Sequence, residues 1–257
     1  MLKRVQHDRT DIAYRLIFMK NNIQDEFIST VSHELRTPLT SIRGFSQTLL
    51  SSWDKLDEDS KKKFVKIIEE QSNRLINLVE NILTVSNINA DTPVFKEVNV
   101  NSAIEKVIQM LSQKYKEHHF ITHFNTHLPP ARLDEDKFQQ IITNLVDNAC
   151  KYSEVGKDVI ISTAFNNSDT VIIKIKDFGV GISPKDAGKI FEKFMRLENH
   201  LTSKTQGNGL GLYITKNLVE SLNGKIDFFS NPDSGTEFSL VFPFFNQEEA
   251  LKCFQQS

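Results

Sequence analysis

The sequence predicts an α+β protein in two parts: a helical hairpin that dimerises into a four-helix bundle, and a mixed domain with helices on one face of a largely antiparallel sheet. Two long apolar stripes with helical spacing predict the hairpin within residues 1–88. After a linker at 91–95, helical patterns and short alternating runs are mixed, which predicts the second part.

Residues 12–52 are predicted to form one long helix, and residues 60–88 a second one, after a polar break at 51–59. A lone hairpin does not bury two apolar stripes, so we expect two copies to pair through residues 24–90 as a four-helix bundle. The stripe of the first helix is Ile12, Leu16, Met19, Ile23, Phe27, Val31, Leu35, Leu39, Ile42, Phe45 and Leu49. That of the second is Phe64, Ile67, Ile68, Leu75, Leu78, Val79, Ile82 and Leu83.

The second part is predicted to hold helices and strands in alternation, with the helices packed on one face of the sheet. Helical patterns occur at 101–118, 134–152 and 208–222. Strand patterns occur at 120–126, 158–165, 170–177, 225–229 and 236–242.

Composition and charge exclude several classes of protein. With 39% hydrophobic and 25% charged residues, the chain is typical of a soluble globular protein, and its net charge of −2 gives no general attraction to nucleic acid. No apolar run approaches the roughly 20 residues that span a bilayer, and the first residues do not resemble a signal peptide. Cys150 and Cys253 match no metal-binding spacing, which favours a reducing cytoplasm.

The segment FISTVSHELRTPL at 27–39 is the first candidate for chemistry. His33 stands two positions from stripe residues on either side, which turns it by about 200° away from the stripe and toward solvent. An acid, Glu34, is beside it, and a hydroxyl, Thr37, follows one helical turn later. By periodicity alone, an ordinary surface histidine explains this position better than a reactive one.

The predicted helix at 134–152 carries a second candidate set. Asn144, Asn148 and Lys151 follow one another at i, i+4 and i+7, beside the apolar stripe. Two carboxamides and an ammonium in this arrangement can hold a hydrated Mg²⁺ and the phosphates bound to it. A solvated helix face explains the same spacing, and the asparagine pair alone does not exclude it.

Two glycine loops form the third candidate set. DFGVGI at 177–182 follows a strand pattern, so Asp177 can accept a hydrogen bond from an amine while Gly179 and Gly181 let a ligand approach the backbone. GNGLGL at 207–212 precedes a helix, whose N-terminal amides favour phosphate. The long polar stretch at 183–206 between them is typical of a lid. A tight turn explains the first loop equally well.

Taken together, these segments resemble the catalytic core of the bacterial sensor histidine kinases of two-component systems. Several motifs in one order are far more specific than any one of them. The match covers roughly residues 24–242. The family's boxes correspond to SHELRTPL at 32–39, NLVDNACKYS at 144–153, DFGVGI at 177–182, FEKFMR at 191–196, GNGLGL at 207–212 and SGTEF at 234–238.

The resemblance implies a division of the chain into five parts. The helical start resembles the coiled-coil end of an input helix. We therefore expect an upstream sensor or membrane segment to be absent from this chain, which would be a cytoplasmic kinase or the cytoplasmic portion of a membrane-bound receptor. The expected parts are an input helix at 1–23, a dimerisation and phosphotransfer domain at 24–90, the linker at 91–95, a Bergerat-type α/β-sandwich ATP-binding domain at 96–245 and a tail at 246–257.

The resemblance also implies roles for the matched residues. His33 is expected to accept phosphate through Nε2, with Glu34 as general base, and Thr37 to position water when phosphate is removed from the partner. Asn148 is expected to bind Mg²⁺, with Asn144 assisting.

The remaining matched residues are expected to bind ATP. Lys151 and Arg196 are expected to contact phosphate, Tyr152 to pack near adenine, and Asp177 to accept a hydrogen bond from the adenine amine. The other expected ATP-binding residues are Gly179, Gly181, Ile182, Phe191, Phe194, Gly207, Gly209, Leu210, Gly211, Leu212 and Thr236. Asn208, where the family often has threonine, and Cys150 are small departures.

The implied activity is autophosphorylation of His33 with ATP and Mg²⁺, transfer to an aspartate of a response-regulator receiver domain, and removal of phosphate from that regulator. Gyrase, mismatch-repair and chaperone ATPases share the implied fold, but they carry a glutamate four residues before the metal-binding asparagine. Here that residue is Asn144, which cannot act as a base, so ATP hydrolysis as the main reaction is disfavoured. A dimeric scaffold that binds nucleotide without catalysis is the other alternative.

Overall fold

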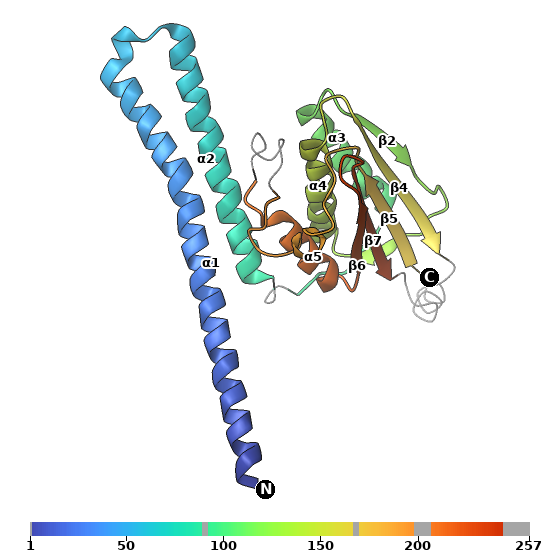
Figure 1. Ribbon diagram of the computed structural model, residues 1–257. Helices are drawn as coiled ribbons and strands as arrows, with labels where there is room; N and C mark the ends of the chain where they lie inside the picture. Colours follow the sequence, from blue (N-terminus) through green and yellow to red (C-terminus); the bar gives the residue numbers. More distant parts are fainter. Residues whose placement is uncertain (1, 89–91, 167–169, 198–206, 244–257) are drawn as a thin grey trace. The chain divides into compact units, whose positions relative to one another are not determined.

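The computed structural model describes residues 2–88, 92–166, 170–197 and 207–243, with side chains from Phe27 onward except that of Asn166. The predicted tail at 246–257 and part of the predicted lid lie outside these residues. Contacts divide the chain after Glu80 into two compact units, which are described separately (Figure 1).

The first unit is a helical hairpin. It consists of α1 (Leu2–Ser52), a 3-10 turn η1 (Trp53–Lys55) and most of α2 (Glu58–Asn87), whose last residues lie past the division. The two helices confirm the predicted hairpin. Helix α1 begins earlier than expected, because residues 2–11 contain no proline or glycine to end it. At the turn, Asp57 accepts hydrogen bonds from Ser60 N and Ser60 Oγ, each at 2.8 Å, and so caps the start of α2.

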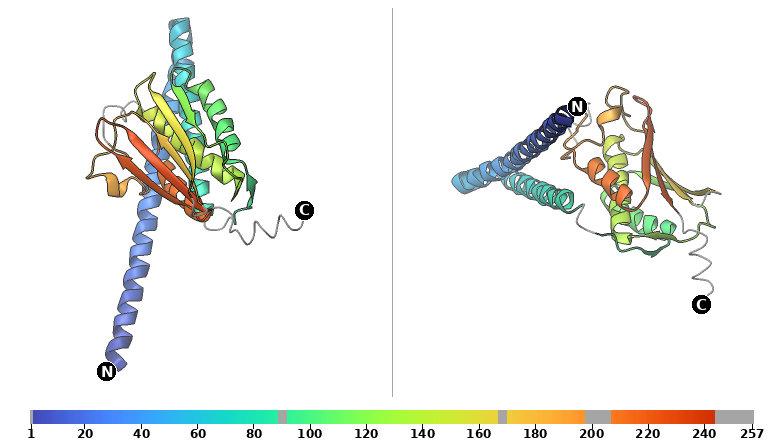
Figure 2. Two further views of the ribbon diagram at one scale, coloured as in Figure 1. Left: turned by 90° about the vertical axis from the view of Figure 1, so that its right-hand side faces the viewer. Right: turned by 90° about the horizontal axis from the view of Figure 1, so that it is seen from below.

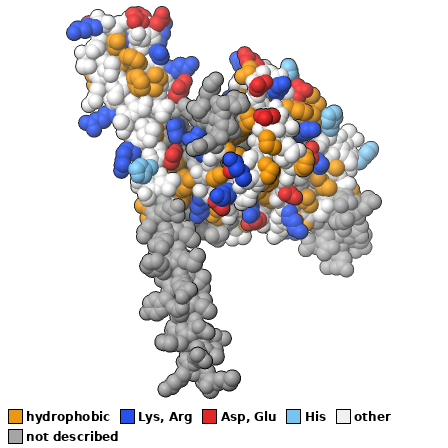
Figure 3. Space-filling view, in the orientation of Figure 1, with side chains coloured by type: hydrophobic (Ala, Val, Ile, Leu, Met, Phe, Trp, Pro, Cys, Tyr) orange, Lys and Arg blue, Asp and Glu red, His pale blue; other side chains and the backbone are white. Residues whose placement is uncertain are grey.

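The hairpin leaves part of its apolar surface uncovered. Phe45 and Phe64 stack between the helices with ring centroids 5.2 Å apart, and Leu78 is buried. Other apolar side chains lie on the surface, and hydrophobic atoms are visible there in Figure 3. The exposed residues are Ile28, Leu39, Leu50, Trp53, Val65, Ile76, Val79 and Leu83. Three of the predicted stripe residues, Leu39, Val79 and Leu83, are therefore not covered by their own hairpin.

The second unit is built on a five-stranded sheet. Its strands are β2 (His119–His123), β4 (Asp158–Asn166), β5 (Thr170–Lys176), β7 (Thr236–Pro243) and β6 (Lys225–Ser230), in that spatial order. Strands β2 and β4 are parallel and all other neighbours are antiparallel, which confirms the predicted sheet. A short antiparallel pair, β1 (Lys96–Val98) and β3 (Ala131–Leu133), was not predicted.

Three helices cover one face of the sheet, as the two views of Figure 2 show. They are α3 (Val100–Lys114), α4 (Glu135–Tyr152) and α5 (Gly211–Ser221), and a second 3-10 turn, η2 (Ala187–Lys189), lies between the glycine loops. The core lies between α4 and the sheet, where the rings of Phe138 and Phe242 meet edge to face at 5.8 Å. Helices α3 and α5 are shorter than predicted, ending before Tyr115 and beginning after Leu210.

The start of α4 is fixed by Asp134. Its Oδ1 accepts a hydrogen bond from Lys137 N at 3.1 Å, and its Oδ2 accepts one from Val94 N at 2.9 Å. The first bond caps the helix, and the second ties the end of the linker to it. Asp134 thus joins two segments that are 40 residues apart in the sequence. Within the residues described, no helix is long and apolar enough to cross a membrane.

We expect Asp134→Ala to destabilise the second unit by about 1–2 kcal/mol, because it removes the helix cap and leaves the Val94 amide without its acceptor. Urea unfolding measures this loss. Asp136→Ala is the matched control, since Asp136 is an exposed acid in the same helical turn. Equal losses in the two variants would contradict the assignment.

Candidate functional site

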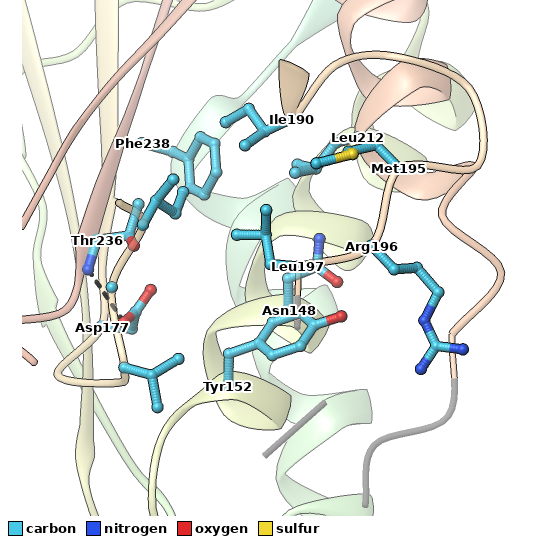
Figure 4. A pocket seen from close by; sticks show the side chains of 13 residues that line it. Asn148, Tyr152, Asp177, Ile190, Met195, Arg196, Leu197, Leu212, Thr236 and Phe238 are labelled. Atoms are coloured by element: carbon cyan, nitrogen blue, oxygen red, sulfur yellow. Dashed lines mark hydrogen bonds between the residues drawn. The ribbon is translucent and has the colours of Figure 1, made fainter. Parts of the chain in front are cut away.

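A pocket opens in the second unit where α4, the ends of β5 and β7, and the loop before α5 meet (Figure 4). Polar side chains lie on one side of it and apolar side chains on the other. The predicted site residues that line the pocket are Asn148, Tyr152, Asp177, Gly181, Ile182, Arg196, Leu212 and Thr236.

Asp177 is the buried polar group of the pocket wall. It follows β5, and its Oδ1 accepts hydrogen bonds from Gly179 N at 2.9 Å and from Thr236 N at 3.1 Å. Burial raises the pKa of this carboxyl to about 6, although the two amides act in the opposite direction. Because both bonds use the same oxygen and the carboxylate faces the pocket (Figure 4), Asp177 can still accept a hydrogen bond from a ligand amine.

The first glycine loop is pressed against α4. A Cβ on Gly179 would lie 2.1 Å from the carbonyl oxygen of Tyr152, and Val180 N donates to that oxygen at 3.2 Å. Gly181 has a φ of 66°, and a Cβ there would lie 1.9 Å from the carbonyl oxygen of Asn231. Only glycine fits either position, and this close approach brings Asp177 next to Tyr152.

Helix α4 presents Asn148 and Tyr152 to the pocket from one face, since they are four residues apart. Asn144, one turn earlier, does not line the pocket. Its Nδ2 donates to Thr215 Oγ1 at 2.6 Å. A Cβ placed on Gly211 would lie only 2.5 Å from its Oδ1, so the backbone of Gly211 packs closely against Asn144. Asn144 therefore fixes the start of α5 against α4.

Lys151 also lies outside the pocket wall, because it forms an ion pair with Asp147, one turn earlier in α4. Asp147 accepts further bonds from Lys114 Nζ and from Tyr115 OH, each at 2.7 Å. Burial raises the pKa of this carboxyl, but Lys151, Lys114 and Tyr115 together hold it below its ordinary value. Sequence reasoning missed Asp147, although an acid four residues before a lysine on a helix predicts such a pair.

The second glycine loop leads into α5. Leu210 is fully buried, Leu212 lines the pocket, and the Oδ1 of Asn208 accepts a bond from Leu210 N at 3.2 Å. Gly209 packs against the backbone of Phe194. A Cβ placed on Gly207 would lie 3.8 Å from the hydroxyl oxygen of Tyr152. Of the residues in this loop, 207–212, Leu212 alone lines the pocket.

Phe191 and Phe194, which were predicted to bind ATP, do not line the pocket. Phe191 packs edge to face on Phe228 at 6.0 Å, and Lys216 Nζ lies 5.6 Å from the Phe191 ring. Phe194 has a φ of 61° in a turn within the stretch predicted as a lid. Arg196 does line the pocket, on the side away from Asp177 (Figure 4).

Sequence reasoning predicted Ile182 and Leu212 but missed most of the apolar wall of the pocket. Its residues carry no polar signal, and in the sequence they are indistinguishable from core residues. They give the pocket a hydrophobic slot that suits a flat aromatic ring with polar edges. The missed residues are Val180, Ile190, Met195, Leu197 and Phe238.

The three residues predicted for phosphotransfer lie on α1. His33 is exposed, as predicted, and Thr37 is exposed too; Thr37 Oγ1 donates to the carbonyl oxygen of His33 at 3.3 Å. Glu34 accepts a hydrogen bond from Arg74 Nη2 at 3.1 Å, across the hairpin from α2. This ion pair was not predicted, because no pattern in the sequence links two helices 40 residues apart.

No group of three or more His, Cys, Asp or Glu side chains that could hold a metal ion occurs in the described part of the chain. A site built from a single carboxamide remains compatible with Mg²⁺, which keeps several waters and takes further oxygens from nucleotide phosphates. Asn148 fits this requirement, since its carboxamide lines the pocket.

Comparison with known proteins identifies both units. Residues 23–91 match the family model described as His Kinase A (phospho-acceptor) domain. Residues 133–246 match the model described as Histidine kinase-, DNA gyrase B-, and HSP90-like ATPase. The chain thus has a phospho-acceptor hairpin followed by an ATP-binding domain.

Curated relatives share this organisation. The signal transduction histidine-protein kinase ArlS of Staphylococcus haemolyticus is 34% identical over 223 residues, which is 86% of this chain and 49% of ArlS. The sensor histidine kinase WalK of Bacillus subtilis is 32% identical over 236 residues, 87% of this chain and 37% of WalK. The chain therefore spans about half or less of the length of these relatives.

Two solved structures have the same fold. Full-length ShkA in complex with AMPPNP is 26% identical, with a TM-score of 0.63, over 85% of this chain and 46% of ShkA. ThkA in complex with the response regulator protein TrrA is 24% identical, with a TM-score of 0.70, over 88% of this chain and 64% of that chain.

The fold and the pocket define the catalytic core of a two-component kinase, with its phospho-acceptor and ATPase domains in order. The chain belongs to the bacterial sensor histidine kinases.

We expect Asp177→Asn to remove a pH dependence of stability. A carboxyl whose pKa is raised by folding binds protons more tightly when folded, so its contribution to stability falls as pH rises from about 4 to about 6. Asparagine keeps an oxygen for the two amides and carries no charge. Thermal unfolding across this pH range should show a smaller decline in the variant than in the wild type.

Asp227→Asn removes a carboxylate from an exposed position on β6 and is the matched control. Its pH profile of unfolding should follow that of the wild type. An unchanged profile in Asp177→Asn, or a large loss of stability at neutral pH, would contradict the role of burial at Asp177.

Proposed function

We propose that this chain phosphorylates itself on His33 with ATP and passes the phosphoryl group to an aspartate of a response-regulator receiver domain. The observation that carries this proposal is the pairing, in one chain, of two features. An exposed histidine lies within a phospho-acceptor domain, and a pocket with a buried carboxylate lies within an ATPase domain.

The pocket supports adenine as the base of the nucleotide. Its apolar wall suits a flat ring, and Asp177 offers an acceptor to an exocyclic amine at one end of the slot. Guanine presents a carbonyl oxygen at the corresponding position, which a carboxylate repels. ShkA, a relative in fold, has been determined with AMPPNP, an adenine nucleotide analogue, which supports the same choice here.

The phosphates are proposed to lie toward Asn148 and the second glycine loop. Bound Mg²⁺ would neutralise charge on the phosphates, with Asn148 supplying a carboxamide oxygen. Arg196 and Lys151 would add positive charge on either side of the phosphate chain. Gly207, Gly209 and Gly211 would let the loop close over the nucleotide.

In the proposed reaction, Nε2 of His33 attacks the γ-phosphorus, the bond from that phosphorus to the bridging oxygen breaks, and ADP leaves. Glu34 stabilises the positive charge that develops on the imidazole ring. Transfer to the regulator then moves the phosphoryl group from Nε2 to an aspartate oxygen. Thr37 is proposed to position a water molecule when the phosphorylated regulator is hydrolysed.

The partners are proposed to be a second copy of this chain and a response regulator. The uncovered apolar face of the hairpin, which includes Leu39, Val79 and Leu83, supports a four-helix bundle formed by two copies. ThkA, a relative in fold, has been determined with a response regulator protein, which supports a partner of that class. We propose a cytoplasmic location, where both ATP and such regulators occur.

The decisive experiment incubates wild-type and His33→Gln protein with Mg²⁺ and ATP labelled at the γ-phosphate. We expect a base-stable, acid-labile label in the wild type and none in the variant, because a phosphoramidate on the His33 ring has this stability and the glutamine side chain offers no ring nitrogen to form one. Nucleotide binding should be equal in the two proteins. His127→Gln, at an exposed position in the second unit, is the matched control and should label normally.

An acid-labile label in His33→Gln would overturn the assignment of the acceptor. Bound ATP with no label in the wild type would favour a nucleotide-binding scaffold instead. These two results are distinguishable because binding and labelling are measured separately.

Asn148→Ala is expected to weaken binding of MgADP by at least tenfold, because it removes the proposed Mg²⁺ ligand, while binding of metal-free adenosine changes little. Calorimetry measures both affinities. Gln139→Ala, on the same helix but away from the pocket, is the control. An equal loss for adenosine would show that Asn148 supports the base and not the metal.

A further inference from the structure

Asp147 carries an arrangement that the proposed reaction does not account for. Its side chain is 15% exposed and has three hydrogen-bond donors around it. Lys114 Nζ and Tyr115 OH, at the end of α3, each lie 2.7 Å from its Oδ1, and Lys151 of α4 pairs with its Oδ2. Two ammonium groups therefore share one carboxylate.

Only two of these three donors are needed to join the helices. Lys114 and Tyr115 reach Asp147 from α3 and so tie α3 to α4. Lys151 belongs to the same helix as Asp147 and adds no link between elements. Its pairing with Asp147 is therefore not explained by packing of the two helices.

Lys151 lies next to the pocket without lining it. It directly precedes Tyr152 and stands three residues after Asn148, and both of these residues line the pocket wall. Side chains three residues apart on a helix are neighbours, with Cβ atoms roughly 5–6 Å apart. The long and flexible side chain of Lys151 can therefore reach either Asp147 or a phosphate group beside Asn148, but not both at once.

Release of Lys151 would not leave Asp147 uncompensated. The carboxylate keeps one full positive charge from Lys114 and a hydrogen bond from Tyr115. A carboxylate that loses its sole cation in a partly buried place is strongly destabilised, whereas one that keeps a second cation is not. The extra donors thus make the movement of Lys151 inexpensive.

We propose that Asp147 is a positioning residue that holds Lys151 away from the empty nucleotide pocket and releases it to the phosphates of a bound nucleotide, while Lys114 and Tyr115 retain the carboxylate. The inference rests on the proposed function, in which Lys151 contacts phosphate. It assigns to Asp147 the control of how strongly the pocket prefers a nucleotide with phosphates over the bare nucleoside.

The test compares the affinities of the full chain for MgADP and for adenosine by calorimetry. In Asp147→Asn, Lys151 has no carboxylate to leave, so the preference for MgADP over adenosine should rise by about two- to fivefold, the range of a partly exposed ion pair. In Lys114→Gln, Asp147 depends on Lys151 alone, and the preference should fall. Glu135→Gln breaks a different α3–α4 ion pair, with Lys106, and should leave the preference unchanged.

A double-mutant cycle separates movement of Lys151 from a general charge effect. If Asp147 acts through Lys151, the effect of Asp147→Asn should disappear in a Lys151→Gln background. An effect of the same size in that background, or a lower preference for MgADP in Asp147→Asn, would overturn the proposal. Unfolding curves of each variant guard against loss of the fold, and Lys114→Gln tests the same idea with Asp147 intact.

The proposed function can fail independently of this inference. If Lys151→Gln alone leaves the preference for MgADP unchanged, Lys151 does not contact phosphate and the proposed role of that residue is wrong. If Lys151→Gln lowers the preference but Asp147→Asn does not raise it, only the positioning role of Asp147 is excluded. Labelling of His33 in each variant shows whether the kinase reaction itself remains.

Discussion

The pocket depends on one carboxylate oxygen that accepts hydrogen bonds from two backbone amides. Asp177 Oδ1 binds the amides of Gly179 and Thr236, while Asp177 N donates to the carbonyl oxygen of Thr236 at 2.8 Å. These bonds hold the end of β5 to the start of β7 and shape the turn that presses on α4. On the polar side of the pocket this turn meets α4, where Val180 N donates to the carbonyl oxygen of Tyr152. The same burial that raises the pKa of Asp177 strengthens its two bonds to the amides, which keep the turn rigid. It also leaves a hydrogen-bond acceptor facing the pocket.

Whereas the pocket depends on a buried polar group, the hairpin has apolar side chains that its own two helices leave exposed. Phe45, Phe64 and Leu78 are packed within one hairpin, whereas Leu39 and Ile76 stay exposed. Exposed apolar side chains at this density are unfavourable in water, so a second hairpin would stabilise the first. His33 lies outside the stripe, which allows one helix to serve both pairing and chemistry.

Much of this organisation was predictable from the sequence, because periodic patterns report long elements well. The hairpin, the helix α4 and the five strands of the large sheet were all predicted from the sequence. The pair β1 and β3 did not, since three-residue strands carry no period. The end of α3 was placed too late, and Tyr115, the residue just after the helix, bonds to Asp147 on another helix. Such a contact has no local signal.

The candidate site divides in the same way. Asp177 and Asn148 are polar residues in recognisable motifs, and the pocket contains both. Phe238 and Met195 look like core residues in the sequence, and only the folded chain puts them in the pocket. Lys151 shows a further limit, because the motif marks this residue but not its ion pair with Asp147 in the folded chain. Asp147 belongs to the same motif, four residues before Lys151, but it was not predicted as the partner of that lysine.

The buried thiol of Cys150 reports on α4, the helix that contributes Asn148 and Tyr152 to the pocket wall. This residue lies between Asn148 and Lys151 on the buried side of α4, and burial, followed by the charge of Asp147, raises the pKa of its thiol to about 12. Almost none of it is thiolate near neutral pH, so alkylating reagents and oxidants react only when the helix opens. The rate of its modification therefore reports local opening of α4, the helix that holds the pocket together. Because Cys150 directly precedes Lys151, this modification reports on the part of α4 that carries the ion pair with Asp147.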